Sequence, residues 1–353
     1  MIIRKQTREI TIKNKKIGGN NPILIQSMTN TKTKDVSKTV EQIKKLEQAG
    51  CDIIRVCVLD MEDALAVKDI KKQINIPLVC DIHYDYKLAI QSILSGCDKI
   101  RLNPGNLKNK EEVKEVVNLC KERNIPIRIG VNSGSLNKLN PTKEDMVDAL
   151  KSHIDILHEL DFYNICISLK SSDLFLTIDS YNLASTLYDY PIHIGVTEAG
   201  TTYQGTIKSS IGLGILLNNG IGDTIRVSLT DDPIKEVLVA KEILHNFGYI
   251  DNNPKFVSCP TCGRCQYNMI EIANKIYDYL LTLKSNIKVA VMGCSVNGPM
   301  EARDSDIGIA GGKVDCLLFK KGEPYKKVSF ENAYEELKNE IDLFIEKEKK
   351  ERP

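Results

Sequence analysis

Short apolar segments alternate with amphipathic segments over the first two thirds of the chain. Each apolar segment is followed by a polar loop and then by apolar residues at every third or fourth position, the pattern of a strand followed by a helix. The predicted strands are Ile23–Gln26, Ile53–Cys57, Leu78–Asp81, Lys99–Leu102, Ile127–Gly130, Ile165–Leu169, Ile192–Gly195 and Thr224–Val227. The predicted helices are Asp35–Ala49, Glu62–Gln73, Tyr86–Ser95, Lys110–Arg123, Lys143–Leu160, Ser172–Asp189, Ser209–Asn218 and Pro233–Phe247.

This alternation predicts an α/β fold, a closed (β/α)₈ TIM barrel. An open, doubly wound sheet is the alternative, although fewer strands are expected for it. The alternating stretch Arg8–Lys13, followed by Gly18–Asn21, predicts a small hairpin before the first strand. The pattern breaks at the turn-rich segment Asp251–Pro254, so we place a domain boundary there. The barrel is expected over residues 1–253 and a second domain over 254–353.

The second predicted domain mixes helices and strands. It contains a helix over Tyr267–Leu283, an apolar strand over Lys288–Met292, and paired strands over Ile307–Gly312 and Val314–Lys320. An amphipathic helix follows over Glu331–Glu346. This pattern predicts a small α+β domain.

Charge and hydropathy limit the classes of partner. The 353 residues include 48 basic and 47 acidic ones. These charges nearly cancel, so no global field attracts nucleic acid or a membrane surface. The first residues lack the apolar core of a signal peptide, and no apolar stretch is long enough to cross a bilayer. We therefore expect a cytoplasmic protein without a nucleic-acid or membrane partner.

Cations recur where the predicted strands end. Sites on a TIM barrel form at the C-terminal ends of its strands. The second, fourth, sixth and eighth strands end at Arg55, Arg101, Lys170 and Arg226, and the fifth strand carries Arg128. Like charges that converge on one mouth destabilise the protein unless an anion neutralises them, and guanidinium groups bind phosphate through two hydrogen bonds. The pattern predicts a substrate with two phosphates or a diphosphate. A nucleotide is less favoured, because the sequence has neither a Walker-type loop nor a dinucleotide fingerprint.

Other polar residues lie at the same strand ends. Asp81 and His83 follow the third strand, Asn132 the fifth, Glu198 the seventh and Ser228 the eighth. Asp81 and Glu198 are candidates for ordering hydroxyl groups or for moving protons. Pairing with the arginines is a nearly equal alternative for either carboxylate.

Four of the eleven cysteines are unusually placed. The others lie in or beside apolar segments and are interpreted as core residues. Cys259, Cys262 and Cys265 have the spacing Cys-x-x-Cys-x-x-Cys, and Cys294 follows in a loop rich in Gly, Asn and Pro. This set predicts a metal centre, either zinc or an iron–sulfur cluster. A cluster domain joined to an anion-binding barrel suggests redox chemistry on a phosphorylated substrate.

Motifs in both predicted domains carry a family resemblance. They are Gln26–Thr29, Ile54–Val56, Asp81–His83, Ile100–Asn106, Arg128–Leu136, Ser168–Ser172, Thr197–Gly200, Ser258–Arg264 and Met292–Ala302. At these residues the chain closely resembles the 4-hydroxy-3-methylbut-2-enyl diphosphate synthases of the methylerythritol phosphate route to isoprenoids. The resemblance covers nearly the full chain, whose length is similar to that of the short, two-domain bacterial form.

The resemblance implies an activity and its cofactor. The activity is the reductive ring opening of 2-C-methyl-D-erythritol 2,4-cyclodiphosphate to the linear allylic diphosphate, with loss of water. Electrons would come singly from a flavodoxin or ferredoxin through a 4Fe-4S cluster held by Cys259, Cys262, Cys294 and Glu301. Because a carboxylate is a more exchangeable ligand than a thiolate, the iron of Glu301 can open to the substrate, with Asn297 beside it.

The resemblance also implies where the substrate binds and how subunits assemble. The five strand-end cations would hold the cyclic diphosphate. A head-to-tail homodimer is implied, in which the cluster domain of one subunit closes over the barrel of its partner.

Two residues depart from the family pattern. Met300 stands where the family usually has glycine, and a side chain restricts the backbone if that position requires a positive φ. Cys265 stands where threonine is common, and we interpret it as a bystander rather than as a ligand in place of Glu301.

Two other functions are compatible with parts of the sequence. One is a pteroate-synthase-like barrel transferase with a structural zinc domain, and the other is a metal-dependent protein that binds a phosphorylated metabolite. A radical S-adenosylmethionine enzyme is disfavoured, because its Cys-x-x-x-Cys-x-x-Cys spacing is absent from the sequence.

Overall fold

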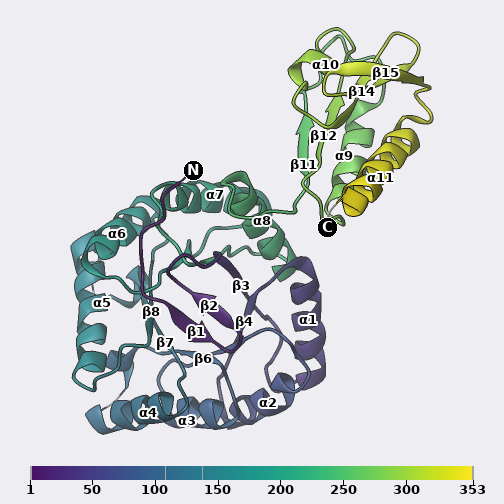
Figure 1. Ribbon diagram of the computed structural model, residues 1–353. Coiled ribbons are helices and arrows are strands. Elements are labelled where there is room, and N and C mark those ends of the chain that lie inside the picture. Colours follow the sequence, from purple (N-terminus) through teal and green to yellow (C-terminus); the bar gives the residue numbers. More distant parts are fainter. Residues whose placement is uncertain (1, 108, 137, 352–353) are drawn as a thin grey trace. The chain divides into compact units, whose positions relative to one another are not determined.

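The chain forms two compact units. The computed structural model describes residues 2–107, 109–136 and 138–351 (Figure 1). The first unit extends to Tyr249 and the second begins at Ile250. Each unit has its own sheet and its own apolar core.

Parallel strands form the barrel of the first unit. They are β3 (Leu24–Met28), β4 (Ile53–Cys57), β5 (Leu78–Asp81), β6 (Lys99–Arg101), β7 (Ile127–Asn132), β8 (Ile165–Lys170), β9 (His193–Gly195) and β10 (Thr224–Arg226). Their order is β8-β7-β6-β5-β4-β3-β10-β9. A parallel bridge between Ile167 and Ile192 joins the two ends of this sheet. The predicted barrel is confirmed, and the open sheet is not.

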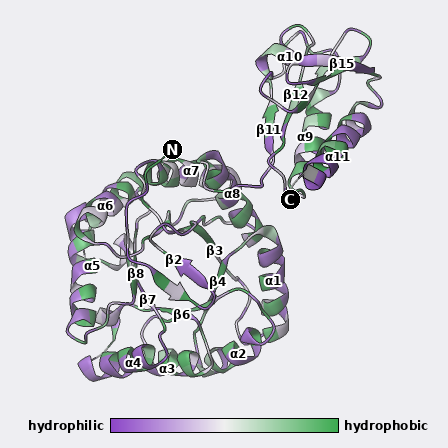
Figure 2. Ribbon diagram, in the orientation of Figure 1, coloured by the Kyte–Doolittle hydropathy of each residue, from purple (hydrophilic) through white to green (hydrophobic). Residues whose placement is uncertain are grey.

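Helices surround the barrel, as Figure 1 shows. They are α1 (Val36–Ala49), α2 (Met61–Lys71), α3 (Tyr86–Leu94), α4 (Lys110–Glu122), α5 (Lys143–His158), α6 (Leu174–Leu187), α7 (Thr202–Asn218) and α8 (Pro233–Asn246). Each carries both hydrophilic and hydrophobic residues (Figure 2). In α4, for example, Val113, Val116, Val117 and Cys120 are buried at helical spacing, so one face packs on the sheet.

Helix α7 begins earlier than the sequence predicts. The periodic pattern places its start at Ser209, but the helix starts at Thr202. Its first turns lack an apolar stripe, with Tyr203 exposed and a glycine at position 205. A Cβ atom on Gly205 would lie 2.9 Å from the backbone carbonyl oxygen of Gly200, which cannot move aside as a side chain can. The glycine, which weakens the helix signal, is therefore required by close packing.

A hairpin closes the N-terminal end of the barrel. Strands β1 (Ile10–Ile12) and β2 (Lys15–Ile17) pair antiparallel, with the turn at Lys13, whose φ is 54°. The hairpin isoleucines pack into one apolar cluster with residues from barrel strands β3, β4, β5 and β8. The predicted hairpin is present, and it covers the N-terminal ends of these barrel strands.

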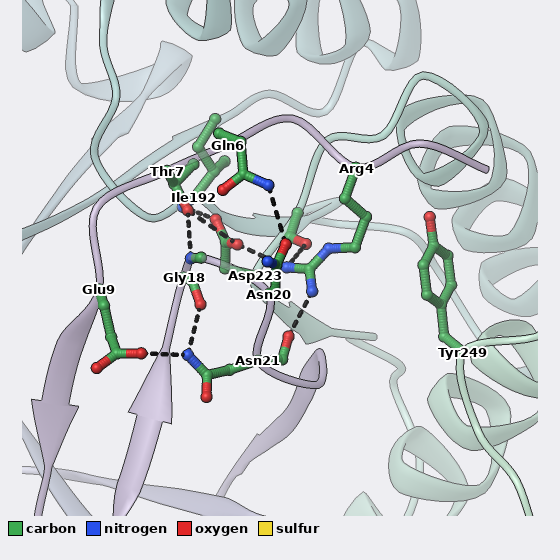
Figure 3. A network of polar contacts seen from close by, with 12 residues as sticks. Arg4, Gln6, Thr7, Glu9, Gly18, Asn20, Asn21, Ile192, Asp223 and Tyr249 are labelled. Atoms are coloured by element: carbon green, nitrogen blue, oxygen red, sulfur yellow. Dashed lines mark hydrogen bonds and ion pairs between the residues drawn. The ribbon is translucent and has the colours of Figure 1, made fainter.

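The N-terminal segment and Asp223 form a polar network beside the starts of strands β9 and β10 (Figure 3). The Asp223 carboxylate accepts hydrogen bonds from Arg4 Nη2 at 2.7 Å, Thr7 Oγ1 at 3.2 Å and the Ile192 backbone N–H at 2.8 Å. Asp223 precedes β10, and Ile192 precedes β9. The buried carboxylate therefore ties these two strands to the N-terminal segment, and burial raises its pKa.

The second unit is an α+β unit with a mixed sheet. Its strands, in sheet order, are β11 (Lys255–Ser258), β12 (Lys288–Met292), β13 (Ile307–Gly311), β14 (Cys316–Lys320) and β15 (Glu323–Val328). The first three are parallel, and β14 and β15 are antiparallel to their neighbours. Helices α9 (Met269–Leu280) and α11 (Ala333–Glu351) contribute buried residues to the core beside this sheet.

Two strands of this unit escaped prediction. Both lie at edges of the sheet, where one side of the strand is unpaired. Strand β15 is exposed along all but its last residue and includes Pro324, which only an edge strand tolerates. Strand β11 is short and half-exposed. Neither strand has the alternating pattern of a half-buried one.

None of the described helices combines the length and the hydrophobicity that a membrane-spanning segment requires.

Candidate active site

The C-terminal ends of the barrel strands line a cavity of about 220 Å³. All the residues predicted to bind substrate lie around it, namely Arg55, His83, Arg101, Arg128, Asn132, Lys170, Arg226 and Ser228. Asp81 lines the same cavity. The structure therefore brings together side chains from six strands and from the loops that follow them.

Positive charge dominates this cavity. Arg55, Arg101, Arg128 and Lys170 are buried, and Arg226 is half-buried. Among the described residues, their ion pairs involve only Asp81 and Glu236. Five cations thus face two carboxylates, and the surplus charge is removed from water. Such an arrangement stabilises a bound anion with more than one negative charge.

Among the described residues, Arg128 is a buried cation with unused hydrogen-bond donors. Its side chain is 2% exposed, and in the described part of the chain its Nε and Nη1 atoms have no hydrogen-bond partner. Burial, followed by the charge of Arg101, lowers its pKa to about 10. Burial and the neighbouring Arg128 and Arg226 also lower the pKa of Lys170 well below its ordinary value. Unused donors point to a ligand with several acceptor oxygens.

Asp81 pairs with two of the arginines. Its carboxylate lies 3.6 Å from Arg55 Nε and 3.3 Å from Arg101 Nη1. Burial raises the pKa of Asp81, but the positive charges of Arg55 and Arg101 lower it by a larger amount. The pKa therefore falls below its ordinary value. Asp81 therefore stays ionised near pH 7. Its contacts are those of a carboxylate that pairs with the guanidinium groups and orients them.

Glu198 occupies an unusual backbone position. It lines an adjoining cavity of about 410 Å³, together with His83, Arg101 and Asn132. Its φ is 53°, in the left-handed region that residues with a side chain seldom adopt. Such backbone conformations gather at functional sites. Within the described residues, no ion pair involves Glu198, so its carboxylate is available to a ligand.

Several residues of these cavities were not predicted. Asn103, Asn106, Ser133, Ser135 and Ser172 line the larger one. All follow predicted strands, so the strand-end rule applied to whole loops would have found them.

Glu236 is different, because it lies on α8. Its Oε2 is 3.7 Å from Arg226 Nη2, and its Oε1 accepts a hydrogen bond of 2.9 Å from the Leu229 N–H. No local sequence signal points to it.

The cysteine motifs of the second unit follow the C-terminal ends of two neighbouring strands. Strand β11 ends just before Cys259, and β12 ends just before Gly293 and Cys294. The two strands are parallel neighbours, so both loops leave at the same edge. The Gly293 N–H donates a hydrogen bond of 3.0 Å to Cys259 Sγ.

The remaining motif residues have distinct surroundings. Cys262 is exposed and Cys294 is half-buried. Cys265 Sγ donates to the Tyr267 carbonyl at 3.3 Å, and Cys265 packs against the apolar core. Glu301 is exposed at the end of the short helix α10 (Gly298–Glu301), where its N–H donates to the Asn297 carbonyl at 2.9 Å.

Met300 does not strain the backbone. It lies inside α10 and is not among the described residues with a positive φ. The position therefore does not require glycine. The methionine side chain is 68% exposed, so it also meets no steric obstacle.

The predicted ligands, three cysteines and one glutamate, are of the residue types that bind iron in iron–sulfur clusters. Across the described residues, no three His, Cys, Asp or Glu side chains gather around a point that could hold one metal ion. In a 4Fe-4S cluster each protein ligand binds a different iron, so the ligands need not meet at one point. Cys259 and Cys294 lie on adjoining loops. Cys262 follows on the first loop, and Glu301 ends the helix α10 that follows the second.

The fold and these two sites define a class: a TIM barrel whose mouth is lined by cations, followed by a cysteine-bearing α+β unit. Residues 7–241 match the family model described as the GcpE TIM-barrel domain. Residues 255–343 match the one described as the GcpE protein C-terminal domain. The chain belongs to the GcpE family.

Curated relatives match almost the whole chain. One from Clostridium perfringens is 57% identical over 340 residues, covering 95% of this chain and 97% of the relative. Another, from Caldanaerobacter subterraneus subsp. tengcongensis, is 56% identical and covers 98% and 99%. Both are named 4-hydroxy-3-methylbut-2-en-1-yl diphosphate synthase (flavodoxin).

A solved structure shares the barrel fold. It is the N-acetylneuraminic acid synthetase of Leptospira borgpetersenii, with a TM-score of 0.51 and 12% identity. The match covers 78% of this chain and 98% of that one. At this identity the likeness concerns the fold alone.

Proposed function

We infer that this chain catalyses the reductive ring opening of 2-C-methyl-D-erythritol 2,4-cyclodiphosphate to (E)-4-hydroxy-3-methylbut-2-enyl diphosphate in isoprenoid biosynthesis. The reaction consumes two electrons and one proton and releases water. The names of relatives that match both units support this inference. The observation in the structure that carries it is the buried surplus of cations at the barrel mouth, which suits a cyclic diphosphate. The relatives do not favour the transferase with structural zinc.

The barrel residues would bind and orient the substrate. We assign the diphosphate to Arg55, Arg101, Arg128, Lys170 and Arg226, and we assign further polar contacts to His83, Asn132 and Ser228. Asp81 would hold the two guanidinium groups that it pairs with. Glu198, which lacks such a pair among the described residues, is the better candidate for holding a proton beside a substrate oxygen.

The second unit would hold the redox cofactor. We propose that Cys259, Cys262, Cys294 and Glu301 bind a 4Fe-4S cluster, with Asn297 beside it. When bound, the cluster supplies electrons one at a time at low potential. Glu301 is the exchangeable ligand of the set, because a carboxylate binds iron less firmly than a thiolate. The relatives' names support a flavodoxin as the electron donor, with a ferredoxin as the alternative.

The composition of anaerobically purified protein tests this assignment. We expect about four iron and four sulfide per chain with broad visible absorption. The Cys294→Ala variant should lose the cluster. The Arg128→Met variant should keep it but fail to turn over the cyclodiphosphate with reduced flavodoxin. Stoichiometric zinc without sulfide, even after anaerobic reconstitution, would contradict the assignment and favour the zinc-containing transferase.

We also propose a head-to-tail homodimer, in which the second unit of one subunit closes over the barrel of its partner. The cavity lined by the five cations and the cysteine motifs belong to different compact units, so a site that uses both is completed either within one chain or between two subunits. Co-assembled Glu301→Ala and Arg128→Met subunits test it. Half of randomly formed dimers would combine both variants and contain one intact site, so about a quarter of the wild-type activity should return. No recovery, despite mixed dimers, would place each site within one chain.

A further inference from the structure

The loop after β6 belongs to the motif Ile100–Asn106, but its polar residues have no role in the proposed binding scheme. The loop forms the 3-10 helix η1 (Pro104–Asn106). Asn103 and Asn106 line the larger cavity beside His83 and Arg101. The position of this short segment therefore determines the shape of one wall of the site.

Asn103 connects the loop to the cation cavity. Its Nδ2 donates to the Gly130 carbonyl at 2.9 Å, and its Oδ1 accepts from the Gly130 N–H at 2.9 Å. Arg101 Nη2 donates to the same carbonyl at 3.3 Å. A Cβ on Gly130 would lie 3.3 Å from Arg101 Nε, so the guanidinium lies against this backbone. Asn103, Gly130 and Arg101 thus form one buried hydrogen-bonded unit.

His153 holds the other end of the loop from the outer helix α5. The Gly105 N–H donates to His153 Nδ1 at 3.1 Å. A Cβ on Gly105 would lie only 2.7 Å from His153 Cε1, so the imidazole lies directly against the glycine. The bond requires an unprotonated Nδ1. Burial, and then the charge of Arg101, lower the pKa of His153, which keeps the ring neutral near pH 7.

We propose that His153 is a positioning residue for the anion site. Through Gly105 it holds η1, and through Asn103 and Gly130 it fixes the guanidinium of Arg101. Arg101 is restrained on one side by Asp81 and on the other by the Gly130 carbonyl. Without His153, the second restraint loses its support from the outer helix. The inference rests on the proposed function, because it assigns Arg101 to the diphosphate.

Two substitutions at position 153 test the proposal. In His153→Leu the acceptor is lost but an apolar side chain remains. In His153→Asn, Oδ1 takes a place close to that of Nδ1 and can accept from the Gly105 N–H. We expect His153→Leu to weaken binding of the cyclodiphosphate about tenfold by titration calorimetry, with a matching rise in KM. His153→Asn should restore most of that affinity. A purely structural role would not distinguish the two variants in this way.

His158→Leu is the matched control on the same helix. The His158 ring is paired with Tyr190 Oη at 2.7 Å and does not line either cavity, so its loss should leave affinity unchanged. If His153→Leu does not fold, Gly105→Ala provides the second variant, since its Cβ pushes the loop and the ring apart. That variant should weaken binding in the same direction.

The outcomes separate this proposal from the proposed function. Wild-type affinity in His153→Leu, or equal losses in the Leu and Asn variants, would overturn the positioning role. Failure of the wild-type protein itself to bind the cyclodiphosphate would instead overturn the proposed substrate. Iron content should be the same in all variants, because the cysteine motifs lie in the other unit.

Discussion

Lys99 is a buried cation on β6, the strand that also carries Arg101 of the cation-lined cavity. It precedes Arg101 by two residues on β6, so both side chains face the barrel interior. Its side chain is fully buried, and among the described residues Nζ has no partner. TIM-barrel interiors are normally filled by bulky apolar residues. Burial lowers the pKa of Lys99 to about 8, below the 10.5 of an ordinary lysine.

We expect Lys99→Met to stabilise the protein and to change its pH dependence. Between pH 8 and 10.5 the unfolded chain holds a proton on Lys99 that the folded chain lacks, so wild-type stability rises with pH in this window. The pKa difference corresponds to about 3 kcal/mol. The advantage of the variant should therefore be greatest below pH 8 and should shrink above it, as measured by chemical denaturation. A pH-independent difference would contradict this account.

Among the elements, the β1–β2 hairpin is the one that seals the barrel. Ile12 and Ile17 are fully buried between the hairpin and the barrel strands. Their contacts lie at the N-terminal end, whereas the cation cavity lies at the C-terminal end. The hairpin contacts and the proposed substrate site thus lie at opposite ends of the same strands.

We expect Ile12→Ala to lower the free energy of unfolding by about 2–5 kcal/mol, because it leaves a cavity in a close-packed region. Affinity for the cyclodiphosphate should remain as in the wild type wherever the variant is folded. Ile3→Ala is the control, since that side chain is 91% exposed and its loss should change little. Equal effects of the two substitutions would show that the hairpin does not seal the core.

At the scale of the whole molecule, the two units have separate cores. Their junction includes Asp251 and Asn252, which are exposed, and Asn252 has a left-handed φ of 57°. Neither residue lies in a helix or strand, and linkers between domains are preferred sites of proteolytic cleavage.

Limited digestion should therefore cut first near residues 250–253. We expect a fragment of the barrel and a fragment of the second unit, each resistant to further digestion, identified by mass spectrometry. A protease of low specificity is the appropriate reagent. First cuts within either sheet-containing unit would contradict the division.

The sequence alone determined the barrel and most of its mouth. The apolar segments matched strands β3 to β10 closely, because strands buried between helices and barrel interior need continuous apolar runs. Arg55, Arg101 and Arg128 could be grouped from their positions on successive predicted strands, since the side chains of parallel strands converge on the site at one end of a barrel. The same rule would have included Asn103 and Asn106.

Only the tertiary structure decided which other groups reach the site. Glu236 on α8 and His153 on α5 come from the outer helices. Neither residue belongs to a local sequence motif that sets it apart from other polar residues of a helix. The early start of α7 and the edge strands β11 and β15 were likewise settled by contacts with distant residues. Local periodicity reports which face of an element is buried, but packing between elements determines which polar side chain meets which backbone group.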